Sequence, residues 1–283
     1  MEFSEVKRDC RFFKGHIPCK FNKLDGSVCG NCAHYQPLET RILIIKLAAL
    51  GDVIRTTPLL ALFRKKYPNA HITWMTQSPE ILPKEQIEQI LPFNAMSVFL
   101  LENSLFDVAV NLDKEAEACV LMAKIEAREK YGYTWDNHAV APCTRAAEHK
   151  LMTGFFDQLS KENTKSYLQE IFEICHASFN FEPYAIQLNQ EKYSHWQRIL
   201  DEKRDGKQVV GLNTGCGPRW NTRLWKDENW VELASTLRQH GYFPMFLGGE
   251  LEHAKNTSLS ENAGVYYPGH FDLETFISLT NSC

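Results

Sequence analysis

The sequence predicts an α/β protein with two Rossmann-like domains that face a cleft. Runs typical of strands alternate with runs typical of helices in residues 41–175, and a second series of the same kind begins at residue 208. Such alternation is typical of parallel sheets whose strands are joined by helical crossovers. A chain of 283 residues is long enough for two domains of ordinary size.

The first series opens with a buried-strand run at 41–46, followed by an expected helix at 52–67. Further strands are expected at 71–75, 96–100 and 106–111. Further helices are expected at 84–91, 115–124 and 148–175, the last interrupted near Asn163. We expect an N-terminal domain over 41–180 and a linker over 181–206, with a polar helix at 191–203 inside the linker.

The second series forms the expected C-terminal domain, residues 207–283. Strands are expected at 208–213, 242–247 and 264–267, and helices at 227–240, 251–260 and 272–283. Three strands are fewer than a doubly wound sheet usually has, and the sequence stops inside an amphipathic helical pattern. We therefore expect that this domain is incomplete and that the native protein continues beyond Cys283.

The composition indicates a soluble globular protein, with 44% hydrophobic and 23% charged residues and a net charge of −4. A protein that binds nucleic acid generally would be basic, so we expect no nucleic-acid partner. The sequence has neither the apolar run of a membrane helix nor the apolar core of a signal peptide. We expect a cytoplasmic location, with peripheral contact to the inner face of the cell membrane as a further expectation.

The first candidate site is the strand, loop and acid at residues 41–58, which read RILIIKLAALGDVIRTTP. Asp52 follows the loop where a parallel sheet binds ligands, and Arg55 and Thr56 lie in the next turn of the helix. An acid at a helix start commonly caps the helix and complements its dipole. The same carboxylate can also accept a proton from an attacking hydroxyl group.

The second candidate site is the loop at 213–225, which joins a strand to a helix. Its glycines allow backbone N–H groups to approach an anion, and its arginines can donate charge-assisted bonds to phosphate. The candidate anion-binding residues are Thr214, Gly215, Gly217, Arg219 and Arg223. An ordinary strand–helix loop is the alternative. The loop is neither a Walker loop nor a Gly-x-Gly-x-x-Gly turn.

A third candidate is the Gly248-Gly249-Glu250 turn at the end of the strand at 242–247. Glycines keep the backbone close to a ligand, and a following acid can bind ribose hydroxyls. Taken alone, the pattern is more typical of a turn with a helix-capping acid. The aromatic stretch at 131–137, YGYTWDN, fits either a sugar-stacking loop or core packing.

The N-terminal extension, residues 1–40, has a cysteine pattern typical of metal sites. Cys10, Cys19, Cys29 and Cys32 are spaced C-x8-C-x9-C-x2-C, and His16 and His34 are alternative ligands. Four thiolates suit structural zinc or iron, whose binding would supply folding energy to so short a segment. Free cysteines in a disordered arm are the alternative. The extension is also basic, a charge that usually forms a solvated face but can meet anionic lipid headgroups.

Together, these motifs resemble the heptosyltransferase-like glycosyltransferases of family nine. The family signature, a strand followed by L-G-D and then T-x-P, matches LGDVIRTTP at 50–58. The donor loop resembles 213–225, where the family's basic residue two before a tryptophan falls on Arg223. The family's Gly-Gly-acid turn falls on 248–250, and residues 146–175 also look like members. The resemblance implies the GT-B architecture, two facing Rossmann domains, with no metal at the transfer site.

The resemblance implies an inverting transfer of a sugar, typically heptose from ADP-heptose, onto a lipopolysaccharide or other glycan acceptor. It implies Asp52 as the general base and Glu250 as a ribose ligand. We expect Arg55 and Thr56 to contact the acceptor, and the 213–225 loop with Gly249 to hold the donor. Two features depart from the family: nothing after Cys283 supplies its D-x-G-x-x-H segment, and the four-cysteine extension is additional. The alternative is a non-catalytic relative that binds a nucleotide or a partner.

Overall fold

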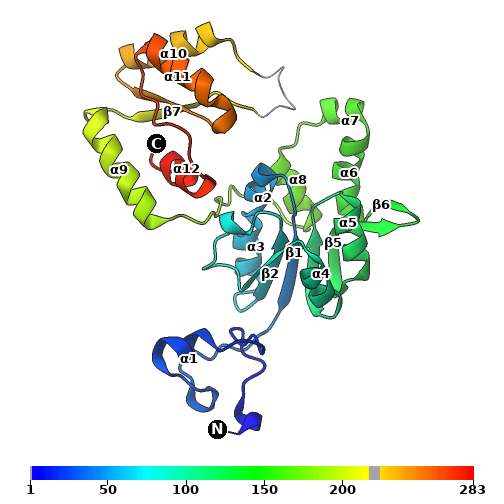
Figure 1. Ribbon diagram of the computed structural model, residues 1–283. Helices are drawn as coiled ribbons and strands as arrows, with labels where there is room; N and C mark the ends of the chain where they lie inside the picture. The colour runs from blue at the N-terminus through cyan, green and yellow to red at the C-terminus, as the bar shows by residue number, and fades with distance from the viewer. Residues whose placement is uncertain (1, 217–223) are drawn as a thin grey trace. The chain divides into compact units, whose positions relative to one another are not determined.

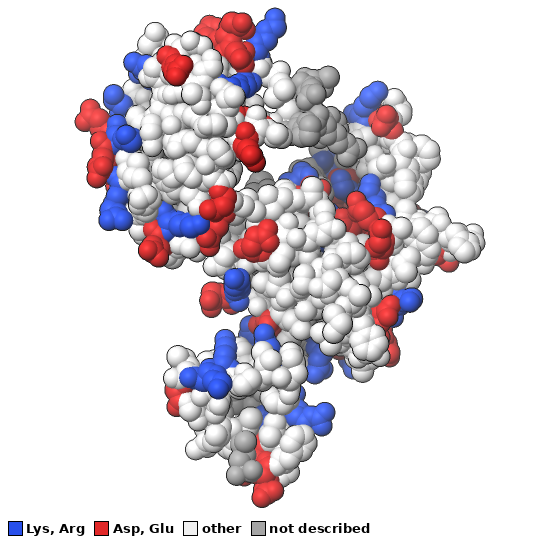
Figure 2. Space-filling view, viewed as in Figure 1, with Lys and Arg blue, Asp and Glu red and all other residues white. Residues whose placement is uncertain are grey.

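A computed structural model describes residues 2–216 and 224–283. The chain divides into two compact units, 1–187 and 188–283 (Figure 1). On the face that Figure 2 shows, acidic and basic side chains are interspersed. Among the described residues, no helix has the length and apolar character needed to cross a membrane.

The first unit begins with the N-terminal extension, residues 2–40 of the described chain and called the arm below, whose aromatic side chains contact one another. Its elements are η1 (Phe3–Glu5), α1 (Lys20–Asp25) and η2 (Cys29–Asn31). Phe21 stacks on His34 with ring centroids 3.9 Å apart and meets Phe12 edge-on at 5.0 Å. Nε2 of His34 lies 2.8 Å from a carboxylate oxygen of Asp25. Hydrogen bonds from Ser27 and His34 lower the pKa of Asp25 to about 2.

The body of the first unit is a six-stranded sheet in the order β3-β2-β1-β4-β5-β6. The strands are β1 (Arg41–Ile45), β2 (His71–Thr76), β3 (Gln89–Pro92), β4 (Leu105–Asn111), β5 (Glu126–Asp136) and β6 (Ala139–Pro142). All pairs are parallel except β5 with β6. The central strand β1 is fully buried from Ile42 to Ile45, as its continuous apolar run predicts.

Helices and short 3-10 turns connect these strands. They are α2 (Leu50–Thr56), α3 (Leu59–Lys66), η3 (Pro79–Ile81), α4 (Ala95–Glu102), α5 (Ala116–Lys124), η4 (Arg145–Ala147), α6 (Glu148–Phe155), α7 (Asp157–Glu162) and α8 (Tyr167–Ile174). The expected helix at 52–67 is two helices that meet at Pro58. The expected interruption near Asn163 is confirmed, and α8 begins after it at Tyr167 with a capping box between Ser166 and Gln169. A further break, at Phe156, was not expected.

Two predicted elements in this unit are wrong. The segment expected as a helix at 84–91 ends instead in strand β3, which pairs with β2. The segment expected as a strand at 96–100 lies in α4, where the side chain of Asn94 accepts the N–H of Ser97 as an N-cap. Segments of about eight residues or fewer fit either state, and sheet pairing or a cap decides between them.

Strand β5 was not predicted, because most of its eleven residues are polar or charged. It pairs with β4 in parallel and with β6 in antiparallel orientation, and it contains most of the aromatic stretch at 131–137. Gly132 has a φ of +89° there. A Cβ at that position would collide with the backbone oxygen of Asn111, so only glycine fits.

The second unit contains a two-stranded parallel sheet of β7 (Val209–Asn213) and β8 (Phe243–Leu247). Its helices are α9 (Gln190–Arg204), α10 (Asp227–Gln239), η6 (Glu250–Glu252), α11 (His253–Ala263) and α12 (Leu273–Thr280). The expected strand at 264–267 is reduced to one bridge, between Met245 and Tyr266. Helix α9, inside the expected linker, contributes Trp196 and Leu200 to the core of this unit.

Candidate functional site

Asp52 lies in the first turn of α2, immediately beyond the carboxyl end of β1. Its side chain is 34% exposed and is paired with Arg55 one turn later. The carboxylate is therefore oriented by a cation and still open to a ligand. Thr56 is fully buried, and its hydroxyl donates to the main-chain oxygen of Asp52 at 2.8 Å. The buried Thr56 hydroxyl is thus turned back onto its own helix, which argues against the expected contact with an acceptor.

The loop between β1 and α2 is anchored by a buried ion pair that the sequence analysis missed. Nζ of Lys46 lies 2.6 Å from a carboxylate oxygen of Asp113, and the two side chains are 5% and 3% exposed. The same ammonium donates to the carbonyl of Ala48, and the other Asp113 oxygen accepts the N–H of Leu47. Burial raises the pKa of Asp113, while Lys46 opposes that shift. The pair fixes the backbone that leads to Asp52.

A second cluster surrounds Tyr167 at the start of α8. The guanidinium carbon of Arg55 lies 4.1 Å from its ring centroid and Nζ of Lys150 lies 5.0 Å from it. Lys150 also pairs with the buried carboxylate of Glu170 at 2.6 Å. Burial raises the pKa of Tyr167 to about 12. Tyr167 therefore stays neutral and supports Arg55 beside Asp52.

In the second unit, Thr214 and Asn256 join the ends of the two strands. The Thr214 hydroxyl donates to the Asn256 side-chain oxygen, and the Asn256 amide donates to the carbonyl of Leu247 at 3.1 Å. The N–H of Thr214 donates to the same carbonyl at 3.2 Å. Asn256 is fully buried on α11. These hydrogen bonds fix the start of the predicted donor loop. The sequence did not indicate this role of Asn256, because a single Asn on a helix is not a recognisable motif.

The resemblance implied a role for Glu250 in the turn after β8, but Glu252 is the acid whose side chain makes contacts there. Its carboxylate accepts the N–H of Gly249 at 3.0 Å. A Cβ on Gly215 would collide with the Glu252 side chain, so the Glu252 side chain packs directly against the backbone of this loop and would have to move to admit a larger residue. Glu250 begins η6 with its side chain exposed. Glu252 is therefore the acid that contacts both glycine-containing loops, at Gly249 and at Gly215.

Three predicted donor-loop residues, Gly217, Arg219 and Arg223, lie outside the described residues. The described start of the loop, Thr214 to Gly215, follows β7, and the Gly248-Gly249 turn follows β8. Because β7 and β8 are parallel neighbours, both segments lie at one edge of this sheet.

The four arm cysteines are partly buried. The two alternative ligands have other partners: His34 contacts Asp25, and Nδ1 of His16 lies 2.8 Å from the carbonyl of Lys14. Within residues 2–216 and 224–283, no three His, Cys, Asp or Glu side chains are arranged to hold a metal ion. A structural zinc or iron site therefore remains a prediction from cysteine spacing.

Comparison with known proteins identifies the fold. No family model matches the chain, and no curated protein matches it in sequence. A family 9 glycosyl transferase from Veillonella parvula DSM 2008 superimposes with a TM-score of 0.60 and 19% identity, covering 87% of this chain and 74% of that one. This chain has the fold of that glycosyltransferase.

Two further structures have the same GT-B fold. E. coli ADP-heptose lps heptosyltransferase II matches with a TM-score of 0.57 and 15% identity, over 86% of this chain and 77% of that one. E. coli heptosyltransferase WaaC with ADP matches with a TM-score of 0.54 and 16% identity, over 84% and 77%. The fold predicted from the sequence motifs is confirmed.

Proposed function

We propose that the protein is an inverting glycosyltransferase that uses a nucleotide-sugar donor, with Asp52 as the general base. The observation that carries the proposal is the Asp52 carboxylate itself. It is oriented by Arg55, is open to solvent and follows the central strand of a GT-B fold. ADP-heptose is the proposed donor, since two of the similar structures are heptosyltransferases and one of them contains ADP.

In the proposed reaction, Asp52 accepts the proton of an acceptor hydroxyl. The resulting oxygen nucleophile forms a bond to the anomeric carbon of the sugar, and the bond between that carbon and the diphosphate oxygen breaks. Attack from the face opposite the nucleotide inverts the anomeric centre. The diphosphate leaves with the bonding electrons, so positive charge and N–H groups near it lower the barrier.

The predicted donor residues divide into anion ligands and ribose ligands. The N–H groups of Gly215 and Gly217, with Arg219 and Arg223, are proposed to offset the charge on the diphosphate. Thr214, whose N–H and hydroxyl both donate within the protein, is proposed to position the start of this loop. Glu250 remains the ribose ligand that the resemblance implies, and Glu252 is proposed to hold Gly249 in place. The Thr214–Asn256 bond supports this assignment because it fixes the loop at its first residue.

The cations near Asp52 favour an anionic acceptor such as a lipopolysaccharide core. Arg55 and Lys150 both contact Tyr167. Burial and the nearby charge of Lys150 lower the pKa of Lys114. A negatively charged acceptor would relieve this like-charge repulsion. We also propose that the basic arm contacts anionic lipid headgroups, which would bring the enzyme to such an acceptor.

Asp52→Asn tests the proposal. Turnover of ADP-heptose with a lipopolysaccharide-core acceptor should fall about 10²–10⁴-fold, while ADP binding stays within about twofold. Asp201→Asn is the matched control, because Asp201 makes the same (i, i+3) pair, with Arg204 on α9. Full activity in the folded Asp52→Asn variant would refute the assignment. ADP binding without turnover in the unaltered protein would favour the non-catalytic alternative.

A further inference from the structure

The second unit contains a pocket that the proposed transfer reaction does not use. It has a volume of about 690 Å³, within the range of small-molecule sites, and lies at the amino-terminal edge of β7 and β8. Lys207 precedes β7 at this edge, whereas Thr214 follows β7 at the other. A five-residue strand spans roughly 17 Å. The pocket is therefore separate from the predicted donor residues of this unit.

The pocket is lined by three cations from three segments: Lys203 on α9, Lys207 before β7, and Arg238 on α10. No Asp or Glu is among its lining residues. In the part of the chain that the structure describes, no carboxylate pairs with any of the three. Arg238 donates through Nη1 to the carbonyls of Ala263 and Gly264, each at 3.0 Å. This contact fixes the guanidinium and leaves its other nitrogen atoms for a ligand.

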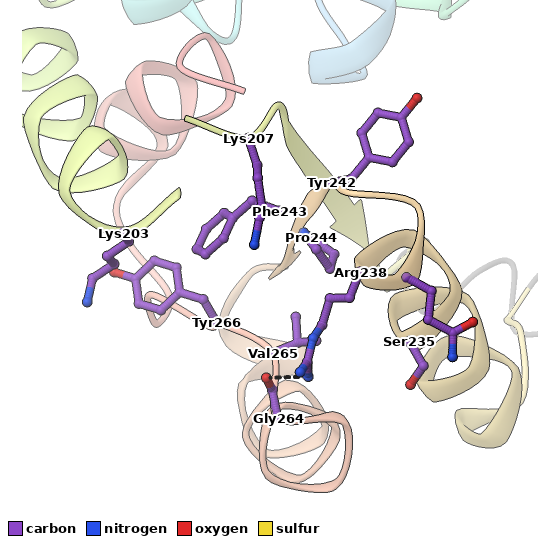
Figure 3. Close-up of a pocket in the computed structure, with 11 residues that line it drawn as sticks. Lys203, Lys207, Ser235, Arg238, Tyr242, Phe243, Pro244, Gly264, Val265 and Tyr266 are labelled. Atoms are coloured by element: carbon purple, nitrogen blue, oxygen red, sulfur yellow. Dashed lines mark hydrogen bonds between the residues drawn. The ribbon is translucent and has the colours of Figure 1, made fainter. Parts of the chain in front are cut away.

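Aromatic rings form the wall beside these cations. The Phe243 and Tyr266 rings have centroids 6.2 Å apart, and Nζ of Lys203 lies 4.8 Å from the Tyr266 centroid. Figure 3 shows Lys207 and Arg238 reaching into the pocket from different elements, with both rings nearby. Each ring is partly buried, so each presents an exposed face or edge as well as a packed one. A planar apolar group can pack against this wall while its anionic end meets the cations.

From this arrangement we propose that the pocket binds a small organic phosphate that carries an aromatic ring. Lys207 and Arg238 contact the phosphate, and Phe243 and Tyr266 contact the ring. The cations alone would hold inorganic phosphate weakly, since all three are solvent-accessible and water competes for them. Selectivity for the ring is therefore the property that distinguishes a built pocket from a merely basic surface.

Phenyl phosphate is the probe, with inorganic phosphate and phenol as its separate halves, titrated into the full chain by calorimetry. Phenyl phosphate should bind with a Kd of about 1 mM or below, at least about tenfold tighter than either half. Lys207→Ala should weaken binding about tenfold, because it removes one charge-assisted contact. Arg198→Ala is the matched control, an exposed cation on α9 outside the pocket, and should change nothing.

Three results would overturn the proposal: no binding at 10 mM phenyl phosphate, equal affinity for inorganic phosphate, or unchanged affinity in Lys207→Ala. The last result would place the probe at another site, including the predicted diphosphate site. No hydrogen bond or ion pair joins the exposed Lys207 side chain to another described residue, so its alanine variant should fold. Circular dichroism checks this. None of these results depends on sugar transfer, so the pocket and the proposed function fail independently.

Discussion

Asp113→Asn tests whether the buried ion pair holds the loop that presents Asp52. The substitution removes the negative charge and keeps the shape, so the Lys46 ammonium stays buried without a counter-charge. Breaking a buried pair by neutralising one member costs about 3–5 kcal/mol. Asn has one oxygen in place of the two that accept from Lys46 and from the Leu47 N–H, so its amide NH2 group must face one of these donors. We expect a loss at the upper end of that range.

Urea unfolding followed by circular dichroism measures this loss. With a slope of about 2 kcal/mol/M, a loss of about 5 kcal/mol lowers the unfolding midpoint by roughly 2.5 M. The double variant Lys46→Met/Asp113→Leu removes both charges and should recover most of the stability, because no buried charge is left unpaired. A change below about 1 kcal/mol in Asp113→Asn would refute the reasoning. So would a double variant less stable than the single one.

The remaining predictions concern the arm and the sheet. Burial would raise the pKa of Glu88, but the Ile72 N–H and two arginines, one of them Arg11 from the arm, lower it. The stability that Glu88 adds should therefore be complete above its ordinary pKa of 4.5 and should disappear as the pH falls below that value. The free energy of unfolding, measured against pH for the unaltered protein and for Glu88→Gln, tests this expectation. Gly132→Ala should cost about 3 kcal/mol or more in thermal unfolding. The control, Gly206→Ala, has a φ of +69° but open space around it and should cost only about 1 kcal/mol. Elemental analysis of the purified chain should find about one zinc or iron per molecule, and Cys29→Ser should lower this content, whereas a metal-free native chain would contradict the cysteine interpretation.

Local sequence determined the central strands and most of the helices. The apolar run of β1 fits burial on both faces, and β4, β7 and β8 were predicted for similar reasons. The failures occurred where a local pattern was ambiguous. Residues 96–100 are apolar enough for a strand, and the Asn94 cap makes them a helix. Strand β5 is too polar to be recognised, and its pairing with β4 and β6 forms it.

The candidate site was likewise predicted from the sequence only in part. The sequence by itself determined that Asp52 follows a buried strand and that glycine-containing loops follow β7 and β8, because both are properties of neighbouring residues. Only the tertiary structure decided that Asp113, 67 residues from Lys46, anchors the loop before Asp52. It also decided that Asn256 holds Thr214 and that Glu252 holds Gly249. Buried polar groups must find hydrogen-bond partners wherever the fold brings them, and such distant pairings leave no pattern in the local sequence.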